Sequence, residues 1–411
     1  MEPGEQLTFW LADMANSDRI TGLVTDNQIA MKIIIDSSPL RNTLTGVGQY
    51  TRYLIENLAE IDKKNSYTLF NVSQQDKAWR NILAPRSNIS YKTVCSTRLR
   101  SLCYRAVRKL FGAPIDLFVE PFTKNKIFFF PNYLQLPLRK NVKSIIVIHD
   151  LSFIFQRQYV HESNQKYLES NLMHSVKNAS HICADSEHTK KEILQHYKID
   201  ENKISVITPA ISHQTFNAIP QHDDQAIVKQ YQLTKPYILF TGTLEPRKNI
   251  IGLLNAYENL PAHLQQEYTL VLVGGKGWLD EEIHHKISEL NHLDIKCTGY
   301  VPDEHLPALY RQASLFVYPS FYEGFGLPPL EAMACGTPVI SSNTSAIPEV
   351  VGSAGILIDP HQPQQLTKAI SSVLSDANLA AKMREQGLIQ AQQFCWKKSA
   401  QQLLQLFQAI A

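Results

Sequence analysis

Two glutamates separated by seven residues, Glu323 and Glu331, are the first candidates for chemistry in this sequence. Paired carboxylates can act as acid, base or nucleophile in glycoside hydrolysis. On a loop and helix of a nucleotide-binding α/β domain, carboxylates more often accept hydrogen bonds from sugar and ribose hydroxyls. Glu331 also follows the predicted helix start at Pro328, where an acidic side chain interacts favourably with the helix dipole. The residues alone leave these interpretations open.

A loop with two adjacent cations, Arg247 and Lys248, lies between an apolar run and a predicted helix. Backbone N–H groups, the helix N-terminus and two cations together favour a dianion such as a pyrophosphate. Solvated surface cations are an equal alternative for this loop taken alone. The sequence contains no G-x-x-x-x-G-K-[ST], and Gly46-Val47-Gly48 lacks the third glycine of a dinucleotide-binding motif, so a dinucleotide-dependent dehydrogenase is disfavoured.

His149 and Asp150 directly follow a buried apolar run. A single histidine is more often structural than catalytic. However, the carboxyl ends of parallel strands are where α/β folds bind ligands, so this pair is expected at the rim of a cleft. The sequence does not decide between the two roles.

The elements that must position these residues repeat in both halves of the chain as strand, loop and helix, which predicts two doubly wound, Rossmann-like α/β domains. Gly46 and Gly48 are expected in a loop before a helix over 49–60, and Ser186 is expected to cap another helix. A strand–helix–strand crossover is expected over 315–340. The predicted strands cover 32–36, 67–72, 127–130, 144–148, 180–184, 204–207, 237–240, 269–273, 295–298, 315–318 and 339–340.

The length of 411 residues fits two domains. Residues 1–30 are interpreted as an N-terminal extension and 31–213 as the first domain. Residues 214–235 are polar and are interpreted as the linker. The second domain is placed at 236–392, and 393–411 are predicted to form a helix that packs back towards the first domain.

Composition limits the classes of partner and compartment. The net charge of +2 gives no field strong enough to argue for nucleic acid. No apolar run reaches the length of a spanning helix, and the acidic N-terminus does not resemble a secretion signal. The six cysteines are scattered singly, which signals neither a zinc site nor a disulfide framework and favours a cytoplasmic compartment.

A basic amphipathic segment at 98–111 stands apart from this pattern. Its basic residues include Arg98, Arg100 and Arg105, while its leucines fall on one helical face. Such a helix can lie on an anionic membrane, which would place the protein peripherally on the inner face of the plasma membrane. A packed helix with a solvated basic face is an equal alternative.

Three motifs together resemble the family-4 retaining glycosyltransferases with a GT-B fold, in which two Rossmann-like domains with parallel sheets face each other across a cleft. They are GTLEPRKN over 242–249, GYVPDEHLPALYRQA over 299–313 and EGFGLPPLEAMACGTPVI over 323–340. The segments 45–50 and 148–151 also match. The family commonly has an arginine where this sequence has Thr243, and the EPRKN form resembles a subgroup of bacterial mannosyltransferases.

The resemblance implies that the first domain takes the acceptor and that the second domain holds most of the nucleotide-sugar donor. It also implies roles for individual residues. It implies that Glu323 contacts the donor sugar, that the backbone of 325–327 meets sugar hydroxyls or phosphate, and that Glu331 takes the ribose hydroxyls. The residues with implied catalytic roles are His149, Arg247, Lys248 and Glu323. The residues with implied donor-binding roles are Gly46, Gly48, Asp150, Gly242, Thr243, Tyr300, Val301, Gly324, Phe325, Gly326, Leu327 and Glu331.

The function implied by the resemblance is retaining transfer of mannose from GDP-mannose to a lipid-linked or polysaccharide acceptor, in O-antigen-like cell-surface glycan synthesis. No cofactor or metal is expected, which agrees with the absence of a D-x-D triplet. Alternatives are a transferase for another GDP- or UDP-sugar, a GT-B epimerase or phosphorylase, and a non-catalytic sugar-nucleotide-binding subunit.

Overall fold

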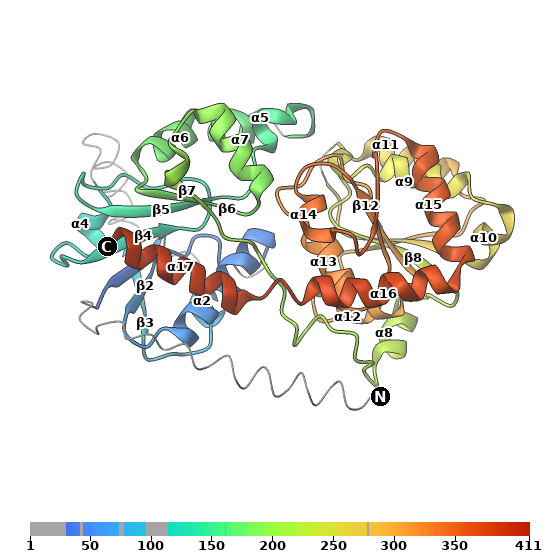
Figure 1. Ribbon diagram of the computed structural model, residues 1–411, viewed down its shortest axis with the longest axis horizontal. Helices are drawn as coiled ribbons and strands as arrows, with labels where there is room; N and C mark the ends of the chain where they lie inside the picture. Colours follow the sequence, from blue (N-terminus) through green and yellow to red (C-terminus); the bar gives the residue numbers. More distant parts are fainter. Residues whose placement is uncertain (1–29, 42–43, 74–77, 96–113, 161, 278) are drawn as a thin grey trace.

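A computed structural model describes residues 30–41, 44–73, 78–95, 114–160, 162–277 and 279–411. Two α/β domains lie side by side, each built on a central sheet with helices on both faces (Figure 1). The predicted pair of Rossmann-like domains is therefore confirmed. The predicted extension before Ala30 and the predicted basic helix over 98–111 lie outside the described residues.

The sheet of the N-terminal domain has seven parallel strands in the order β3-β2-β1-β4-β5-β6-β7. All its predicted strands form, but the edge strand β3 was not predicted because its side chains are only partly buried and carry little apolar pattern. The strands are β1 (Lys32–Asp36), β2 (Ser66–Ser73), β3 (Ile89–Cys95), β4 (Lys126–Phe130), β5 (Lys143–Ile148), β6 (His181–Ala184) and β7 (Ile204–Val206).

The first helix of the N-terminal domain shows that the predicted loop at Gly46 and Gly48 is wrong. Helix α2 begins at Gly46, so Gly46 and Gly48 lie in its first turn and not in a loop. Gly48 is needed for packing, because a Cβ there would lie 3.0 Å from Pro39 O. Ser186 caps α7 as predicted, accepting a hydrogen bond from Thr189 N–H. The helices are α2 (Gly46–Ile61), α4 (Asp116–Val119), α5 (Ser152–Phe155), α6 (Glu162–Asn178) and α7 (Glu187–Tyr197).

The sheet of the C-terminal domain has six parallel strands in the order β10-β9-β8-β11-β12-β13. Its central strands are buried on both faces, which explains their continuous apolar runs. Strands β11 and β12 pair in parallel, with Phe316 opposite Val339, so the predicted crossover is confirmed. The strands are β8 (Tyr237–Thr241), β9 (Thr269–Val273), β10 (Ile295–Gly299), β11 (Leu315–Tyr318), β12 (Val339–Ser342) and β13 (Ile356–Ile358).

Two helices follow the segments that run between the domains, and each packs on the domain that it enters. Helix α8, in the predicted linker, packs on α12, where Arg311 Nε donates to Asp224 at 2.8 Å. Helix α17 crosses α2 on the N-terminal domain and buries Trp396 and Phe407 there (Figure 1). The remaining helices are α8 (Asp224–Gln230), α9 (Ile250–Glu258), α10 (Ala262–Glu267), α11 (Glu281–Glu289), α12 (Leu306–Gln312), α13 (Leu327–Ala334), α14 (Ile347–Val351), α15 (Pro363–Ser375), α16 (Ala377–Ala391) and α17 (Trp396–Ile410).

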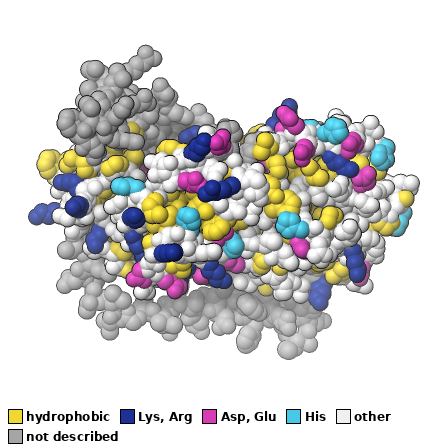
Figure 2. All heavy atoms as spheres, turned by 90° about the horizontal axis from the view of Figure 1, so that it is seen from above, with side chains coloured by type: hydrophobic (Ala, Val, Ile, Leu, Met, Phe, Trp, Pro, Cys, Tyr) yellow, Lys and Arg dark blue, Asp and Glu magenta, His cyan; other side chains and the backbone are white. Residues whose placement is uncertain are grey.

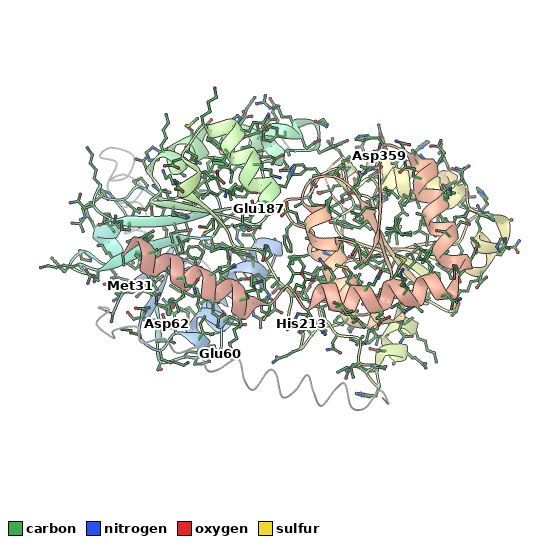
Figure 3. All side chains as sticks on the ribbon, in the orientation of Figure 1. Met31, Glu60, Asp62, Glu187, His213 and Asp359 are labelled. Carbon is green, nitrogen blue, oxygen red and sulfur yellow. The ribbon has the colours of Figure 1, made fainter. Side chains whose placement is uncertain are left out.

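Two segments of the chain run between the domains, one leaving the N-terminal domain and one returning to it. His213 is labelled in Figure 3, where the chain leaves the N-terminal domain. Its Nε2 lies 3.0 Å from the carbonyl oxygen of Phe394, which is on the returning segment. On the face shown in Figure 2, basic and acidic side chains of the described residues are interspersed. Across those same residues, every helix is too short or too polar to cross a bilayer.

Candidate functional site

A cleft of about 670 Å³ lies between the two domains, at the carboxyl ends of strands from both sheets. It is where an α/β fold is expected to bind ligands. Most of the predicted site residues meet in it although they come from opposite ends of the chain. The predicted residues that line it are Gly46, His149, Asp150, Gly242, Thr243, Arg247, Lys248, Glu323, Gly324, Phe325, Gly326, Leu327 and Glu331.

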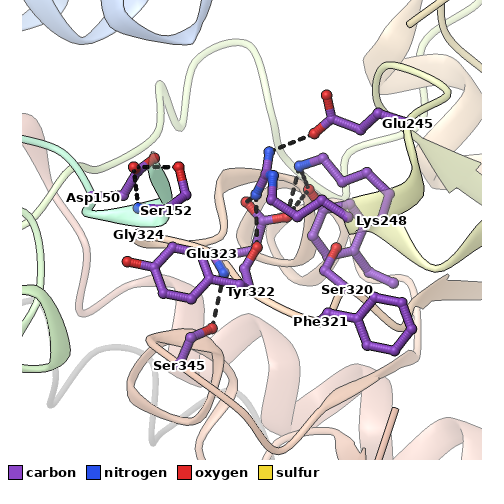
Figure 4. Close-up of polar contacts among 12 residues, drawn as sticks. Asp150, Ser152, Glu245, Lys248, Ser320, Phe321, Tyr322, Glu323, Gly324 and Ser345 are labelled. Atoms are coloured by element: carbon purple, nitrogen blue, oxygen red, sulfur yellow. Dashed lines mark hydrogen bonds and ion pairs between the residues drawn. The ribbon is translucent and has the colours of Figure 1, made fainter. Parts of the chain in front are cut away.

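A cluster of charged side chains forms the C-terminal wall of the cleft (Figure 4). Lys248 Nζ lies 2.6 Å from Glu323 Oε1, and Arg247 lies 3.0 Å from Glu323 Oε2. Arg247 also donates to Glu245 at 2.6 Å, and Lys248 donates to the hydroxyl of Tyr318. Two cations and two carboxylates are therefore held in fixed positions before any ligand arrives.

The charges of this cluster shift the pKa values of its members. Burial alone would raise the pKa of Glu323, but Arg247 and Lys248 outweigh burial and lower it to about 2. Burial and the neighbouring Arg247 lower the pKa of Lys248. Burial raises the pKa of Glu245, against the opposing effect of Arg247. Glu323 is thus ionised, and Glu245 is the carboxylate of this cluster that takes up a proton most readily.

Local backbone structure explains why these side chains converge. The turn Pro246–Lys248 ends at Asn249, which adopts φ 54° and caps α9 through a hydrogen bond from Gly252 N–H. Asparagine tolerates this left-handed conformation. On the facing loop, Gly326 adopts φ 119° at the N-cap of α13, a backbone conformation that glycine accommodates.

Glu331 lies in the same cleft on α13. It accepts a hydrogen bond from the hydroxyl of Tyr310 at 2.9 Å, and Tyr310 in turn contacts Thr241 Oγ1 at 2.6 Å. Burial raises the pKa of Glu331 to about 7, although the bond from Tyr310 opposes the shift. This carboxyl therefore changes its charge near neutral pH.

His149 lies on the N-terminal wall of the cleft, as predicted from its position after β5. Its Nε2–H donates to the carbonyl of Pro131 at 2.9 Å, and its Nδ1 lies 2.8 Å from Asp185 Oδ2. Burial lowers the pKa of His149, but Asp185 outweighs burial and raises it. A direct bond from a ring nitrogen to a ligand would require one of these two contacts to break.

A second cavity of about 550 Å³ opens on the N-terminal domain and shares Asp150 with the cleft. Asp36, Arg41 and Tyr167 are among its lining residues. Tyr133, which lines this second cavity, adopts φ 53° and packs edge-on against His149. A strained tyrosine of this kind is typical of a functional site.

Three predicted donor-binding residues do not line the cleft. Tyr300 is 66% exposed, Val301 is buried in the core of the C-terminal domain, and Gly48 is buried within α2. Residues that the sequence analysis missed include Glu245, Tyr318, Asp185 and Asp303, all of which line the cleft. Asp185 directly follows β6, so the rule that selected Asp150 could have found it.

Comparison with known proteins supports this architecture. The family model "Glycosyl transferases group 1" matches residues 223–390, and the model "Glycosyltransferase Family 4" matches residues 44–215. The chain is 33% identical over 387 residues to O-antigen chain mannosyltransferase B of Escherichia coli, covering 92% of this chain and 100% of the relative. It is 29% identical over 396 residues to the serotype-specific mannosyltransferase WbdA of Escherichia coli, covering 90% of this chain but only 47% of WbdA.

Solved structures share the fold at low sequence identity. Sucrose-phosphate synthase from Thermosynechococcus elongatus superposes with a TM-score of 0.68 at 22% identity, covering 92% of this chain and 99% of that chain. WaaG, a glycosyltransferase involved in lipopolysaccharide biosynthesis, superposes with a TM-score of 0.67 at 13% identity, with the same coverage. These matches confirm the predicted GT-B fold.

Proposed function

Since the chain belongs to the family-4 glycosyltransferases, we propose that it transfers mannose from GDP-mannose to a lipid-linked or polysaccharide acceptor in O-antigen-like cell-surface glycan synthesis. The observation that carries the proposal for the donor is the pair of fixed cations, Arg247 and Lys248, on the wall of the cleft. The choice of mannose rests on the names of the E. coli relatives.

The diphosphate of the donor binds beside Arg247 and Lys248 in this proposal. Breaking the bond from the anomeric carbon to the diphosphate places negative charge on the leaving oxygen. Cations already held in position stabilise that charge more strongly in the transition state than in the ground state. They supply the charge stabilisation without a metal ion, and Arg247 provides the second cation that the family commonly places at the position of Thr243.

The two glutamates of the donor domain bind hydroxyl groups. Glu323 faces the sugar and also holds both cations, and Glu331 accepts hydrogen bonds from the ribose diol. In the retaining step, the acceptor oxygen attacks the anomeric carbon from the face that the diphosphate leaves. The bond from carbon to the diphosphate oxygen breaks, the bond from carbon to the acceptor oxygen forms, and the acceptor proton passes to the diphosphate.

The acceptor occupies the cavity of the N-terminal domain. Two carboxylates, Asp36 and Asp150, and one cation, Arg41, line it beside Phe153 and Tyr167. This mixture suits a neutral sugar, because carboxylates accept from hydroxyl pairs and aromatic faces pack on C–H groups. An acidic group would meet more negative than positive charge there.

The test is donor consumption by the purified full chain with a panel of GDP- and UDP-sugars in EDTA, with and without a lipid-linked acceptor, measured as nucleoside diphosphate release. We expect release with GDP-mannose and acceptor, and its loss in Glu323→Ala and Lys248→Ala. Lys382→Ala, a change of an exposed lysine on α16, is the control. If no donor is consumed, or if the first two variants match the control, the proposal is wrong.

Peripheral membrane contact through residues 98–111 is a second part of the proposal. High salt should release electrostatically attached protein from membranes, and so should combined neutralisation of Arg98, Arg100 and Arg105. Retention of the variant on anionic vesicles at low salt would contradict membrane contact through this segment.

A further inference from the structure

Tyr322, one residue before Glu323, reaches out of the C-terminal domain into the N-terminal domain. The residue is buried, with 3% of its surface exposed. Its hydroxyl donates to Glu192 Oε2 on α7 at 2.6 Å and accepts from Leu151 N–H at 3.0 Å. This hydroxyl thus makes one donated and one accepted hydrogen bond, both to the opposite domain.

The backbone of Tyr322 belongs to the charged cluster. Its carbonyl accepts from Arg247 at 2.6 Å, and the next residue, Glu323, binds both cations. In Figure 4 the Tyr322 ring points away from the Lys248–Glu323 contact and towards the segment of Asp150 and Ser152. One residue therefore joins the cation cluster to the segment that follows β5.

The surrounding contacts follow the same route between the domains. Ser186 Oγ donates to the carbonyl of Gly324 at 2.8 Å. Glu349 on α14 accepts from the N–H groups of Glu187 and His188 at 2.8 and 2.7 Å. These two N–H groups lie at the N-terminus of α7, where a carboxylate is favoured, and Figure 3 labels Glu187 beside the C-terminal domain.

We propose that Tyr322 and Glu192 are positioning residues that hold the closed arrangement of the domains, in which Glu323 and Arg247 face the N-terminal wall of the cleft. This inference rests on the proposed function, because it concerns the same donor site. In an open arrangement Glu192 and the hydroxyl of Tyr322 would be hydrated separately. The hydrogen bond from the Tyr322 hydroxyl to the Glu192 carboxylate forms only when the domains are closed. It therefore favours the closed form, in which donor and acceptor face each other.

The kinetic test is a double-mutant cycle on the full chain. Tyr322→Phe removes only the hydroxyl and Glu192→Ala removes its partner. Each should lower kcat about 10-fold while the dissociation constant for nucleoside diphosphate stays within about 2-fold, and the double variant should lose no more than either single one. Glu192→Gln keeps an acceptor and should restore most of the rate. Additive losses, or a parallel loss of nucleotide affinity, would overturn the inference.

A second measurement does not depend on turnover. In Tyr322→Phe the amides of Glu187 and His188 should exchange hydrogen faster than in the parent protein, because the closed form is less populated. Tyr257→Phe is the matched control, since its hydroxyl donates to Tyr268 O at 2.6 Å within the C-terminal domain. Unchanged exchange in Tyr322→Phe refutes the positioning role even if no donor is found. Absence of donor turnover with altered exchange refutes only the proposed function.

Discussion

The two domains share a strand order but place different chemistry at the ends of their strands. In the N-terminal domain, β1 and β5 lead to Asp36 and Asp150, which line an open cavity with a single arginine. In the C-terminal domain, the loop after β8 and the loop after β11 bring two cations onto Glu323. The shared topology fixes where ligands bind, and the loop sequences decide which ligand charge each domain favours.

Removing a cation from the donor domain should have the largest effect. Lys248→Ala deletes a fixed positive charge and leaves Glu323 with Arg247 as its remaining cation, so we expect kcat to fall about 1,000-fold. Arg41→Ala, in the cavity of the other domain, should change the rate less than about 10-fold. Rates of nucleoside diphosphate release measure both. Equal losses would show that the two cavities do not differ in their preference for charge.

Disrupting the contact between the domains should have the second-largest effect. A Cβ at Gly324 would lie 2.1 Å from the backbone oxygen of His149, so Gly324→Ala must push the domains apart. We expect about a 100-fold loss of kcat from misplaced substrates, with nucleotide affinity retained. Gly275→Ala is the control, because a Cβ there meets no atom within 4 Å. X-ray scattering should show a more extended Gly324→Ala protein, and an unchanged profile with normal kcat would contradict the role of this contact.

Changing Asp150, which lines both cavities, should have a smaller effect that falls mainly on the acceptor. Asp150→Asn keeps an oxygen for the hydrogen bonds from the Ser152 N–H and hydroxyl groups at 3.0 and 2.8 Å. It removes the negative charge from the shared boundary of the two cavities. We expect the KM for acceptor to rise about 10-fold with little change in donor affinity. A rise in the donor dissociation constant alone would reverse the assignment of the two cavities.

The smallest expected effect is a dependence of donor binding on pH. Glu331 has a pKa of about 7, raised by burial despite the bond from Tyr310, with Asp303 as a further raising charge. Ribose hydroxyls donate to an ionised carboxylate more strongly than to a protonated one. Donor affinity should therefore rise several-fold as pH increases from 6 to 8, measured by calorimetry. Glu331→Gln should flatten this dependence, and an unchanged slope would assign the titration to another group.

Much of the fold follows from local sequence. Buried strands such as β9 can be predicted from continuous apolar runs, because both faces of a parallel sheet are covered. Helix α6 and strand β3 were missed because tertiary contacts stabilise them more than local pattern does. In α6, Leu172 and Val176 are fully buried within a largely polar sequence.

The sequence by itself determined three things: the succession of strands and helices along the chain, the family, and the residues of the charged loops. All three depend on local pattern and motif. Only the tertiary structure decided which of them meet. Glu192 and Tyr322 are 130 residues apart, and no local signal pairs them. Asp185 contacts His149, 36 residues away along the chain, and Lys248 contacts Glu323, 75 residues away, so neither contact lies within one motif. A site formed between two domains is specified by the contact of the domains, which periodicity along one chain cannot report.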